Sequence, residues 1–440
     1  MSTPNVIERI AAGHAGLAPT FAGGPDWARR RARSLDTIVS RGLPDRRDEN
    51  WKYLDHAKLA EYRFEAAPHA AIAAAGLGPR LLPIADARRI VLVDGRLDAA
   101  LSDFPAVDGL EVIDLAAMIE RDPDAALALL RAPGDEADDR FALLADAFAA
   151  GGVAIRIAPG TVLRDPLCLV HVASAATAAV HQARVVIDVG DRAKLTLVEH
   201  FIALGTEAAL GNLAGEISIG AGAEFVHVRL HEHAPAAAQV ETWTGRLASG
   251  SRYDQHLLAL GGRMFRSDLR LSLEGRAATC RLAGLFMTDG ERQADIHTQV
   301  EHQGAATVTQ QDYRGIAAGR GRGAINGRIV VQASARGADA SQSIRNLLLS
   351  PLAELNARPQ LEIHVDDVKC RHGATTGSLD EAQLFYLQSR GLDPAAARAL
   401  LTFAFCQDMV GRLPLPALRA ATEKLVAGAL PDRDLIRGLL

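Results

Sequence analysis

The chain has 440 residues, of which 48% are hydrophobic and 23% are charged. These proportions are typical of a globular protein with a sizeable core, and they exclude intrinsic disorder and collagen-like repetition. The 48 Lys and Arg residues against 53 Asp and Glu give a net charge of −5, which argues against a strongly basic nucleic-acid binder. At roughly 100–200 residues per domain, the length predicts two to four domains.

The four cysteines, Cys168, Cys280, Cys370 and Cys406, lie far apart and form no C-x-x-C pair. This spacing argues against a disulfide framework and a self-contained zinc site, and it suits a reducing compartment. The N-terminus has no apolar core of signal-peptide length. No run approaches the roughly 20 apolar residues that span a bilayer. We therefore expect a soluble, cytoplasmic protein that does not bind membranes.

Residues 1–150 are predicted to form a mostly helical first domain. A helix is expected over Asp26–Arg41, because Asp26 can act as the N-cap and glycine and proline follow the last turn. A short strand is expected over Ile90–Val93, before an Asp-Gly turn. Two further helices are expected over Leu115–Leu130 and Glu136–Ala150, where apolar residues recur at helical spacing.

Residues 151–376 change pattern, and we predict that they form a β-solenoid core. Helical periodicity gives way to short alternating runs, each broken by Gly, Asp or Asn. Gly190 and Gly220 lie 30 positions apart at the same point of similar runs, and Gly250 lies 30 further on. Such a period favours a solenoid over a doubly wound α/β fold. A pair of β-sandwiches is the competing fold, because these periods also suit hairpins.

Residues 377–440 return to helical periodicity and are predicted to form a helical C-terminal domain. One helix follows Asp380, with Leu384, Phe385 and Leu387 on its buried side, and others are expected over Pro394–Gly411 and Pro416–Leu430. The simpler interpretation is that these helices cap the end of the solenoid. The alternative is a docking platform, because the second helix is apolar over much of its circumference.

The glycine run Gly319–Gly327 does not form a nucleotide-binding motif. It lacks the Gly-Lys-Ser/Thr ending of a P-loop, and its glycine spacing differs from the dinucleotide fingerprint. We expect tight turns between solenoid strands here, and no ATP bound by this chain.

Three histidines in HVRLHEH, His227, His231 and His233, would share one face of an uninterrupted strand. At about 3.3 Å per residue they spread over about 20 Å, which is too far for one metal ion. At most His231 and His233 could share an ion, with help from elsewhere. A solvated outer face is the favoured interpretation.

The segment Leu361–Gly377 is the densest in reactive groups. Cys370 and His372 lie two apart and would share a face of an extended strand, next to Lys369 and Arg371. Positive charge nearby would favour a thiolate and make Cys370 a nucleophile or soft-metal ligand, whereas a buried, inert cysteine is the alternative. One Cys and one His cannot hold an iron–sulfur cluster, which takes about four protein ligands. A cluster here would need ligands from a partner chain.

The segment DDVKCRHGATTGSLDEAQLFYLQSRGLD, Asp366–Asp393, resembles the C-terminal signature that SufB and SufD share, D-V-K-C-x-H-G-A-T followed by LFYLxSRG. The segment GLPDRRDENWKYLD, Gly42–Asp55, is similar to the N-terminal motif of SufD, and the stretches VLVDGRL and YRGIAAGRGRGAINGRIVV also match. The chain is identified as a member of the SufD family of iron–sulfur cluster assembly proteins. Arg371 departs from the pattern, because small residues such as Ser are common there.

The resemblance implies a mainly β fold, in which a right-handed parallel β-helix core is flanked by N-terminal and C-terminal helical domains. It also implies a non-catalytic scaffold in a complex with SufB and the ATPase SufC, on which iron–sulfur clusters are assembled. The SufB and SufD β-helices would meet near the assembly site. There His372, with Cys370 beside it, would help to hold a nascent cluster. Reduced flavin accompanies some complexes of this kind, and no motif here identifies its site.

The resemblance further implies that the C-terminal helices contact SufC. Five apolar residues would divide between the core of a cap and that contact: Leu384, Phe385, Tyr386, Phe403 and Phe405. Two alternatives remain. One is a homodimer without SufB. The other is a β-helix enzyme that processes polysaccharides, for which the adjacent Asp366 and Asp367 are poor catalytic carboxylates, since they would point to opposite faces of a strand.

Overall fold

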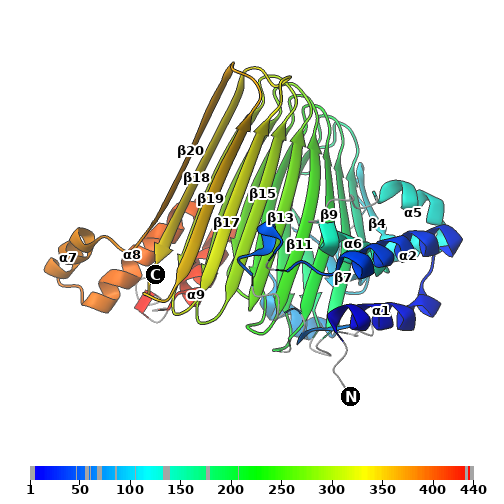
Figure 1. The fold of residues 1–440 in the computed structure, drawn as a ribbon, viewed down its shortest axis with the longest axis horizontal. Coiled ribbons are helices and arrows are strands. Elements are labelled where there is room, and N and C mark those ends of the chain that lie inside the picture. The colour runs from blue at the N-terminus through cyan, green and yellow to red at the C-terminus, as the bar shows by residue number, and fades with distance from the viewer. Residues whose placement is uncertain are drawn as a thin grey trace.

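The centre of the molecule is a β-solenoid, in which the chain winds through two long sheets that face each other (Figure 1). The structure is a computed structural model, and it describes residues 5–45, 47–54, 59, 61–66, 72–84, 87–104, 106–131, 139–174, 179–206, 208–431 and 435–436. Successive coils place one strand in each sheet, so the sheets hold alternate strands in chain order. The predicted solenoid is confirmed, and the competing β-sandwich pair is wrong.

We call the two sheets the odd sheet and the even sheet. The odd sheet runs in the order β4 (Leu110–Asp114), β5 (Gly152–Ile157), β7 (Ala179–Val189), β9 (Leu210–Ile219), β11 (Ala238–Leu247), β13 (Met264–Leu273), β15 (Gln293–His302), β17 (Arg322–Val331) and β19 (Glu354–Ile363), and β1 (Arg63–Ala66) also pairs with β7. The even sheet runs in the order β3 (Arg96–Leu97), β2 (Arg88–Val93), β6 (Leu167–Ala173), β8 (Lys194–Ala203), β10 (Glu224–Glu232), β12 (Arg252–Ala259), β14 (Thr279–Thr288), β16 (Val308–Ala317), β18 (Ala338–Leu348) and β20 (Val368–Gly377).

Neighbouring strands from β5 to β20 are parallel and almost perfectly in register, so equivalent positions of successive coils stack in rows. Alternate side chains of each strand point into the solenoid, as the period of two requires. The apolar ones form the main core, which includes Leu197, Phe225, Leu257 and Leu282. The glycines that recur every 30 residues lie at the turns, where the chain passes close to the previous coil. A Cβ on Gly190 would lie 2.7 Å from a backbone oxygen of that coil.

The glycine run is only partly a turn. Gly319 has a φ of +58° in the turn before β17, but Gly323 and Gly327 lie within that strand. A Cβ on Gly323 would lie 2.4 Å from the ring of Phe286. The expectation of tight turns throughout this run is therefore wrong for its second half, where the missing side chains leave room for neighbours inside the solenoid.

The N-terminal helices are α1 (Val6–Leu17), α2 (Gly24–Arg41), α3 (Ala74–Leu77), α4 (Leu115–Arg121), α5 (Pro123–Leu129) and α6 (Arg140–Ala147). The predicted helix Leu115–Leu130 is two helices, because Asp122 ends α4 and caps α5 through Ala125 N, while Pro123 has no N–H to continue the first helix. The start of the predicted helix Glu136–Ala150 lies outside the described residues, as do Arg46 and Asp55 of the N-terminal motif.

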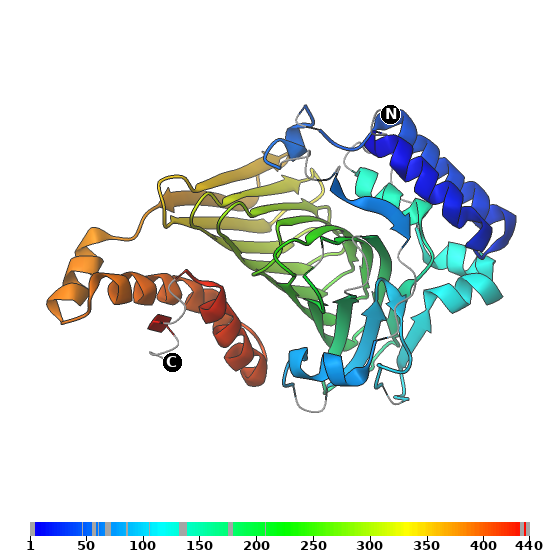
Figure 2. The same cartoon turned by 90° about the horizontal axis from the view of Figure 1, so that it is seen from below.

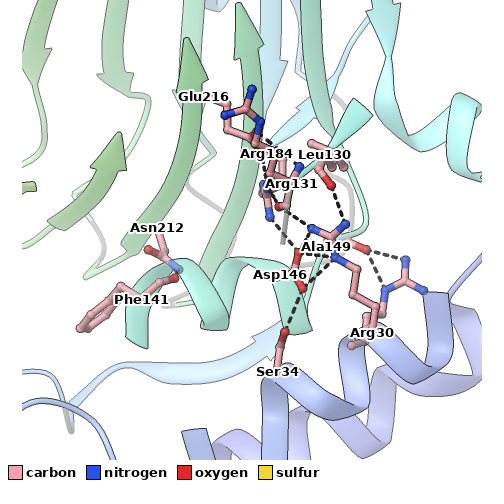
Figure 3. A network of polar contacts seen from close by, with 11 residues as sticks. Arg30, Ser34, Leu130, Arg131, Phe141, Asp146, Ala149, Arg184, Asn212 and Glu216 are labelled. Atoms are coloured by element: carbon pink, nitrogen blue, oxygen red, sulfur yellow. Dashed lines mark hydrogen bonds and ion pairs between the residues drawn. The ribbon is translucent and has the colours of Figure 1, made fainter. Parts of the chain in front are cut away.

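One buried carboxylate joins these helices to the solenoid. Asp146 of α6 is fully buried and accepts hydrogen bonds from Arg30 and Ser34 of α2 and from Arg184 of β7 (Figure 3). The Arg184 guanidinium also donates to Glu216 of β9 at 2.6 Å. Three elements that are far apart in sequence therefore meet at a single charge.

The C-terminal helices are α7 (Glu381–Ser389), α8 (Pro394–Val410) and α9 (Pro416–Ala429). They begin as the sequence predicts, since Asp380 caps α7 and α8 starts at Pro394, and the structure adds Asp393 as the cap of α8. However, α8 and α9 lie along the outer face of the even sheet (Figure 2). Phe403 and Cys406 pack there with Val228 and Leu285. The expectation that these helices cap the end of the solenoid is wrong. None of the described helices is long and apolar enough to cross a membrane.

Candidate functional site

The last coil of the solenoid leaves both of its strands at a sheet edge. β19 ends the odd sheet and β20 ends the even sheet, and no described strand pairs with either outer edge (Figure 1). Most side chains of β20 are exposed. Pro359 in β19 removes one backbone donor from such an edge, which is where a strand tolerates proline.

Cys370 and His372 both lie on β20, as the sequence predicts, and they share its inward face. Cys370 aligns with Ala340 of β18 and His372 aligns with Gln342, and both of these partners point into the solenoid. Lys369 and its i+2 neighbour Arg371 lie on the opposite face of the strand, since successive side chains alternate.

The Cys370 thiol is not activated as the sequence suggested. It is partly buried and packs against the small buried cluster that includes Ile329, Ala338 and Ala340. Burial and the nearby carboxylate of Asp339 raise the pKa of the Cys370 thiol. Of the two alternatives for Cys370, the structure favours the buried cysteine over the thiolate, because Lys369 and Arg371 lie on the other face of the strand.

His372 is exposed on the uncovered coil. Nowhere in the described chain do three His, Cys, Asp or Glu side chains come together closely enough to hold a metal ion. Cys370 and His372 are thus a pair of candidate ligands that this chain alone does not complete. Asp366 and Asp367 lie in the turn before β20 and not on a strand, where Gly337 N donates to Asp367 O at 2.7 Å.

The HVRLHEH histidines are not on a solvated outer face, so that interpretation is wrong. His227 and His231 are fully buried on the inward face of β10. His227 Nε2 lies 2.9 Å from Glu199 Oε2, and its Nδ1 lies 3.0 Å from Tyr253 Oη. His233 follows β10, and its Nε2 lies 3.2 Å from His231 Nδ1.

Opposite charges hold this interior cluster together. Arg229 pairs with Glu241 of β11, and its Nε lies 3.5 Å from Glu199. Burial alone would raise the pKa of Glu199, but hydrogen bonds from His171 and His227 outweigh it and hold that pKa well below its usual range. Burial lowers the pKa of His227, so a neutral ring lies beside an ionised carboxylate.

Sequence reasoning missed this cluster, although a signal was present. Polar residues at inward positions of one solenoid strand require partners of opposite charge at inward positions of its neighbours. The run LTLVEH places Glu199 on the equivalent strand, two residues before Phe201. Phe201 in turn stacks between His171 and His231, with ring centroids 4.1 Å from each.

The five candidate interface residues separate into two groups. Phe385 and Tyr386 on α7 are 72% and 57% exposed, and Leu384 is partly exposed. No described residue of α7 is buried, so the expected buried side of this helix is wrong. Phe403 is buried against the even sheet, and the partly buried Phe405 lies under the Arg314 guanidinium at 4.9 Å. These two residues belong to the core between α8 and the sheet.

These observations define a class of protein: a β-solenoid whose last coil is uncovered and carries a Cys–His pair. Residues 171–405 match the family model described as "SUF system FeS cluster assembly, SufBD core domain". The chain belongs to this SufBD family, and it is similar to its SufD members.

Two relatives cover the chain almost throughout. The iron-sulfur cluster assembly protein SufD of Escherichia coli (strain K12) is 31% identical over 409 residues, which are 90% of this chain and 92% of the relative. An iron-sulfur cluster assembly SufBD family protein of Synechocystis is 27% identical over 410 residues, which are 90% of each chain. The family expected from the C-terminal signature is thus confirmed.

Proposed function

We propose that this chain is a non-catalytic scaffold subunit of iron–sulfur cluster assembly, which acts together with a SufB-like paralogue and a SufC-like ABC ATPase. The observation that carries the proposal is the incomplete ligand pair, Cys370 and His372, on the uncovered edge strand β20. Family membership supplies the context, because the relatives are named for cluster assembly.

The nascent cluster is the cargo of this site, held transiently. His372 offers an imidazole nitrogen, and Cys370 offers sulfur once its proton has left. Because burial raises the pKa of the Cys370 thiol, iron binding would have to displace that proton and would weaken as the pH falls. The remaining ligands come from the last coil of the paralogue, which stacks on β19 and β20.

The ATPase docks on α7. Phe385 and Tyr386 form an exposed aromatic pair there, and aromatic residues are enriched in the cores of protein interfaces. α8 then links that dock to the solenoid, because Arg314 of β16 pairs with Asp408 and donates to Phe405 O at 2.5 Å. ATP hydrolysis by the partner would shift α7 and reshape the shared edge through this link.

The test is co-purification from the native host without oxygen, through a tag on this chain, followed by iron and sulfide analysis. We expect an ABC-type ATPase and a larger paralogue to be recovered with the wild type. His372→Ala should keep both partners and lose most of the iron and sulfide. The matched control is His364→Ala, because His364 is half-exposed near the same end of the solenoid and makes its contact with Glu362 of β19.

Two outcomes would overturn the proposal. One is recovery of a lone, metal-free wild-type chain. The other is a His372→Ala complex with the iron and sulfide of the wild type, which would remove His372 from the site.

A further inference from the structure

We propose that Gln342 is the positioning residue of the candidate site: its Oε1 accepts a hydrogen bond from one ring nitrogen of His372 and leaves the other nitrogen free to bind iron. This inference rests on the proposed function for the role of His372, but the hydrogen bond itself does not.

Register places the two side chains together. Gln342 of β18 aligns directly with His372 of β20 in a parallel ladder. Neighbouring strands lie about 4.8 Å apart, and aligned residues project to the same side. Gln342 is on the inward face and is 4% exposed, and His372 is the next residue of the same row.

Contacts deeper in the solenoid fix which end of the Gln342 amide faces His372. Gln311 Oε1 accepts a hydrogen bond from Thr298 Oγ1 at 2.9 Å and one from Gln342 Nε2 at 3.4 Å. The amide nitrogen of Gln342 is thereby held toward β16. Gln342 Oε1 is buried and accepts no hydrogen bond from any described residue, His372 included. The exposed His372 ring would turn inward to donate to it.

The opposite sheet makes room for this arrangement. A Cβ on Gly327 of β17 would lie 2.9 Å from Gln342 Nε2 and 3.1 Å from Gln311 Oε1. Glycine at this position therefore lets both amides lie flat across the interior. The acceptor is held in place before any donor reaches it.

His372 is the donor that completes the row. A buried acceptor without a partner is destabilising, and His372 is the residue of the uncovered coil that aligns with Gln342 in that row. A histidine that binds a metal usually donates its second ring N–H to a carbonyl or carboxylate, which sets the tautomer and makes the ligand nitrogen more basic. The Gln342 carbonyl oxygen supplies that function here.

The test measures which tautomer the His372 ring adopts in the full chain at pH 8, from the ¹⁵N chemical shifts of the ring nitrogens. The His372 signals are assigned by comparison with the His372→Ala variant. In the wild type we expect one tautomer to dominate. Gln342→Leu removes the acceptor and should shift the ring toward the mixture found in free imidazole. Gln342→Glu keeps an acceptor oxygen and should restore the wild-type tautomer.

The matched control is Gln255→Leu. Gln255 is 2% exposed in the same inward row, and its Oε1 also lacks a partner within the described residues. It lies on β12, three strands away from Gln342 and four from His372. This variant should leave the His372 spectrum unchanged. Identical His372 spectra for wild type and Gln342→Leu would overturn the inference, as would an equal change in the control.

Iron retention distinguishes this inference from the proposed function. In the co-purified complex, Gln342→Leu should lower the affinity for iron by roughly 10–100-fold, and Gln255→Leu should not. If His372→Ala retains iron fully while the tautomer still depends on Gln342, the proposed function fails and the hydrogen bond stands. If His372→Ala loses iron and Gln342→Leu changes neither tautomer nor iron, only the inference fails.

Discussion

At the residue scale, the interior of the solenoid is unusual for its buried neutral histidines, and one of them makes stability depend on pH. His302 is fully buried at the end of β15, with Nδ1 2.8 Å from Thr307 Oγ1. Its Nε2 has no partner among the described residues, so a proton there would be buried without an acceptor. Burial lowers the pKa of His302 from 6.5 to about 4.

The unfolded chain therefore takes up a proton on this ring at a higher pH than the folded chain does. The stabilisation from the neutral ring is complete above pH 6.5 and is lost as the pH falls toward 4, by about 3 kcal/mol in total. We expect His302→Gln to flatten the pH dependence of the urea midpoint between pH 7 and pH 5. Val300→Ala removes buried carbon from the same strand, and it should lower stability equally at both pH values.

At the scale of elements, the attachment of α2 and α6 to the odd sheet depends on Asp146. Removing one partner of a buried ion pair leaves uncompensated charge and costs about 3–5 kcal/mol. Here Asp146→Ala would leave Arg30 and Arg184 without their shared carboxylate. We expect the variant to lose about that much stability, with the largest gain in amide hydrogen exchange in α2.

The control variant changes an ion pair at the start of α2, the helix in which exchange is measured. Arg29 pairs with Asp26 at the surface, where both side chains are more than half exposed, and such pairs contribute about 0–1 kcal/mol. Arg29→Ala should leave exchange in α2 nearly unchanged. Similar exchange for Asp146→Ala and wild type would show that apolar packing alone holds the helices to the sheet.

The elements also show what the sequence could predict. Local rules were sufficient for the cap of α7 at Asp380, the start of α8 at Pro394 and the period of the coils. They failed at the start of α2, whose N-cap is Gly23 and not the predicted Asp26. The direction in which a helix packs is not a local property, so the placement of α8 on the sheet face escaped prediction. The candidate pair Cys370 and His372 followed from alternation along one strand. The ionisation of Cys370 and the role of Gln342 depend on residues of other coils.

At the scale of the whole molecule, the solenoid carries two uncovered surfaces that differ in chemistry. One is the edge of β19 and β20, which presents backbone groups and the inward residues of the last coil. The other is the aromatic pair on α7. Unpaired strand edges tend to associate with other chains. An exposed aromatic pair on a projecting helix is a second surface of this kind. The two partners of the proposed function, which differ in kind, would account for both.

This arrangement predicts that the two partners can be lost independently. Ala374 is exposed on the inward face of β20, so Ala374→Glu leaves the isolated fold intact but places a charge where a partner coil would bury it. We expect this variant to co-purify with the ATPase and not with the paralogue. The double variant Phe385→Ser, Tyr386→Ser should bind the paralogue and not the ATPase.

As a control, Val39→Ser alters an apolar residue of α2 that is 45% exposed and should keep both partners. Loss of both partners from either variant, with the fold unchanged by circular dichroism, would mean that the complex assembles through a single continuous surface.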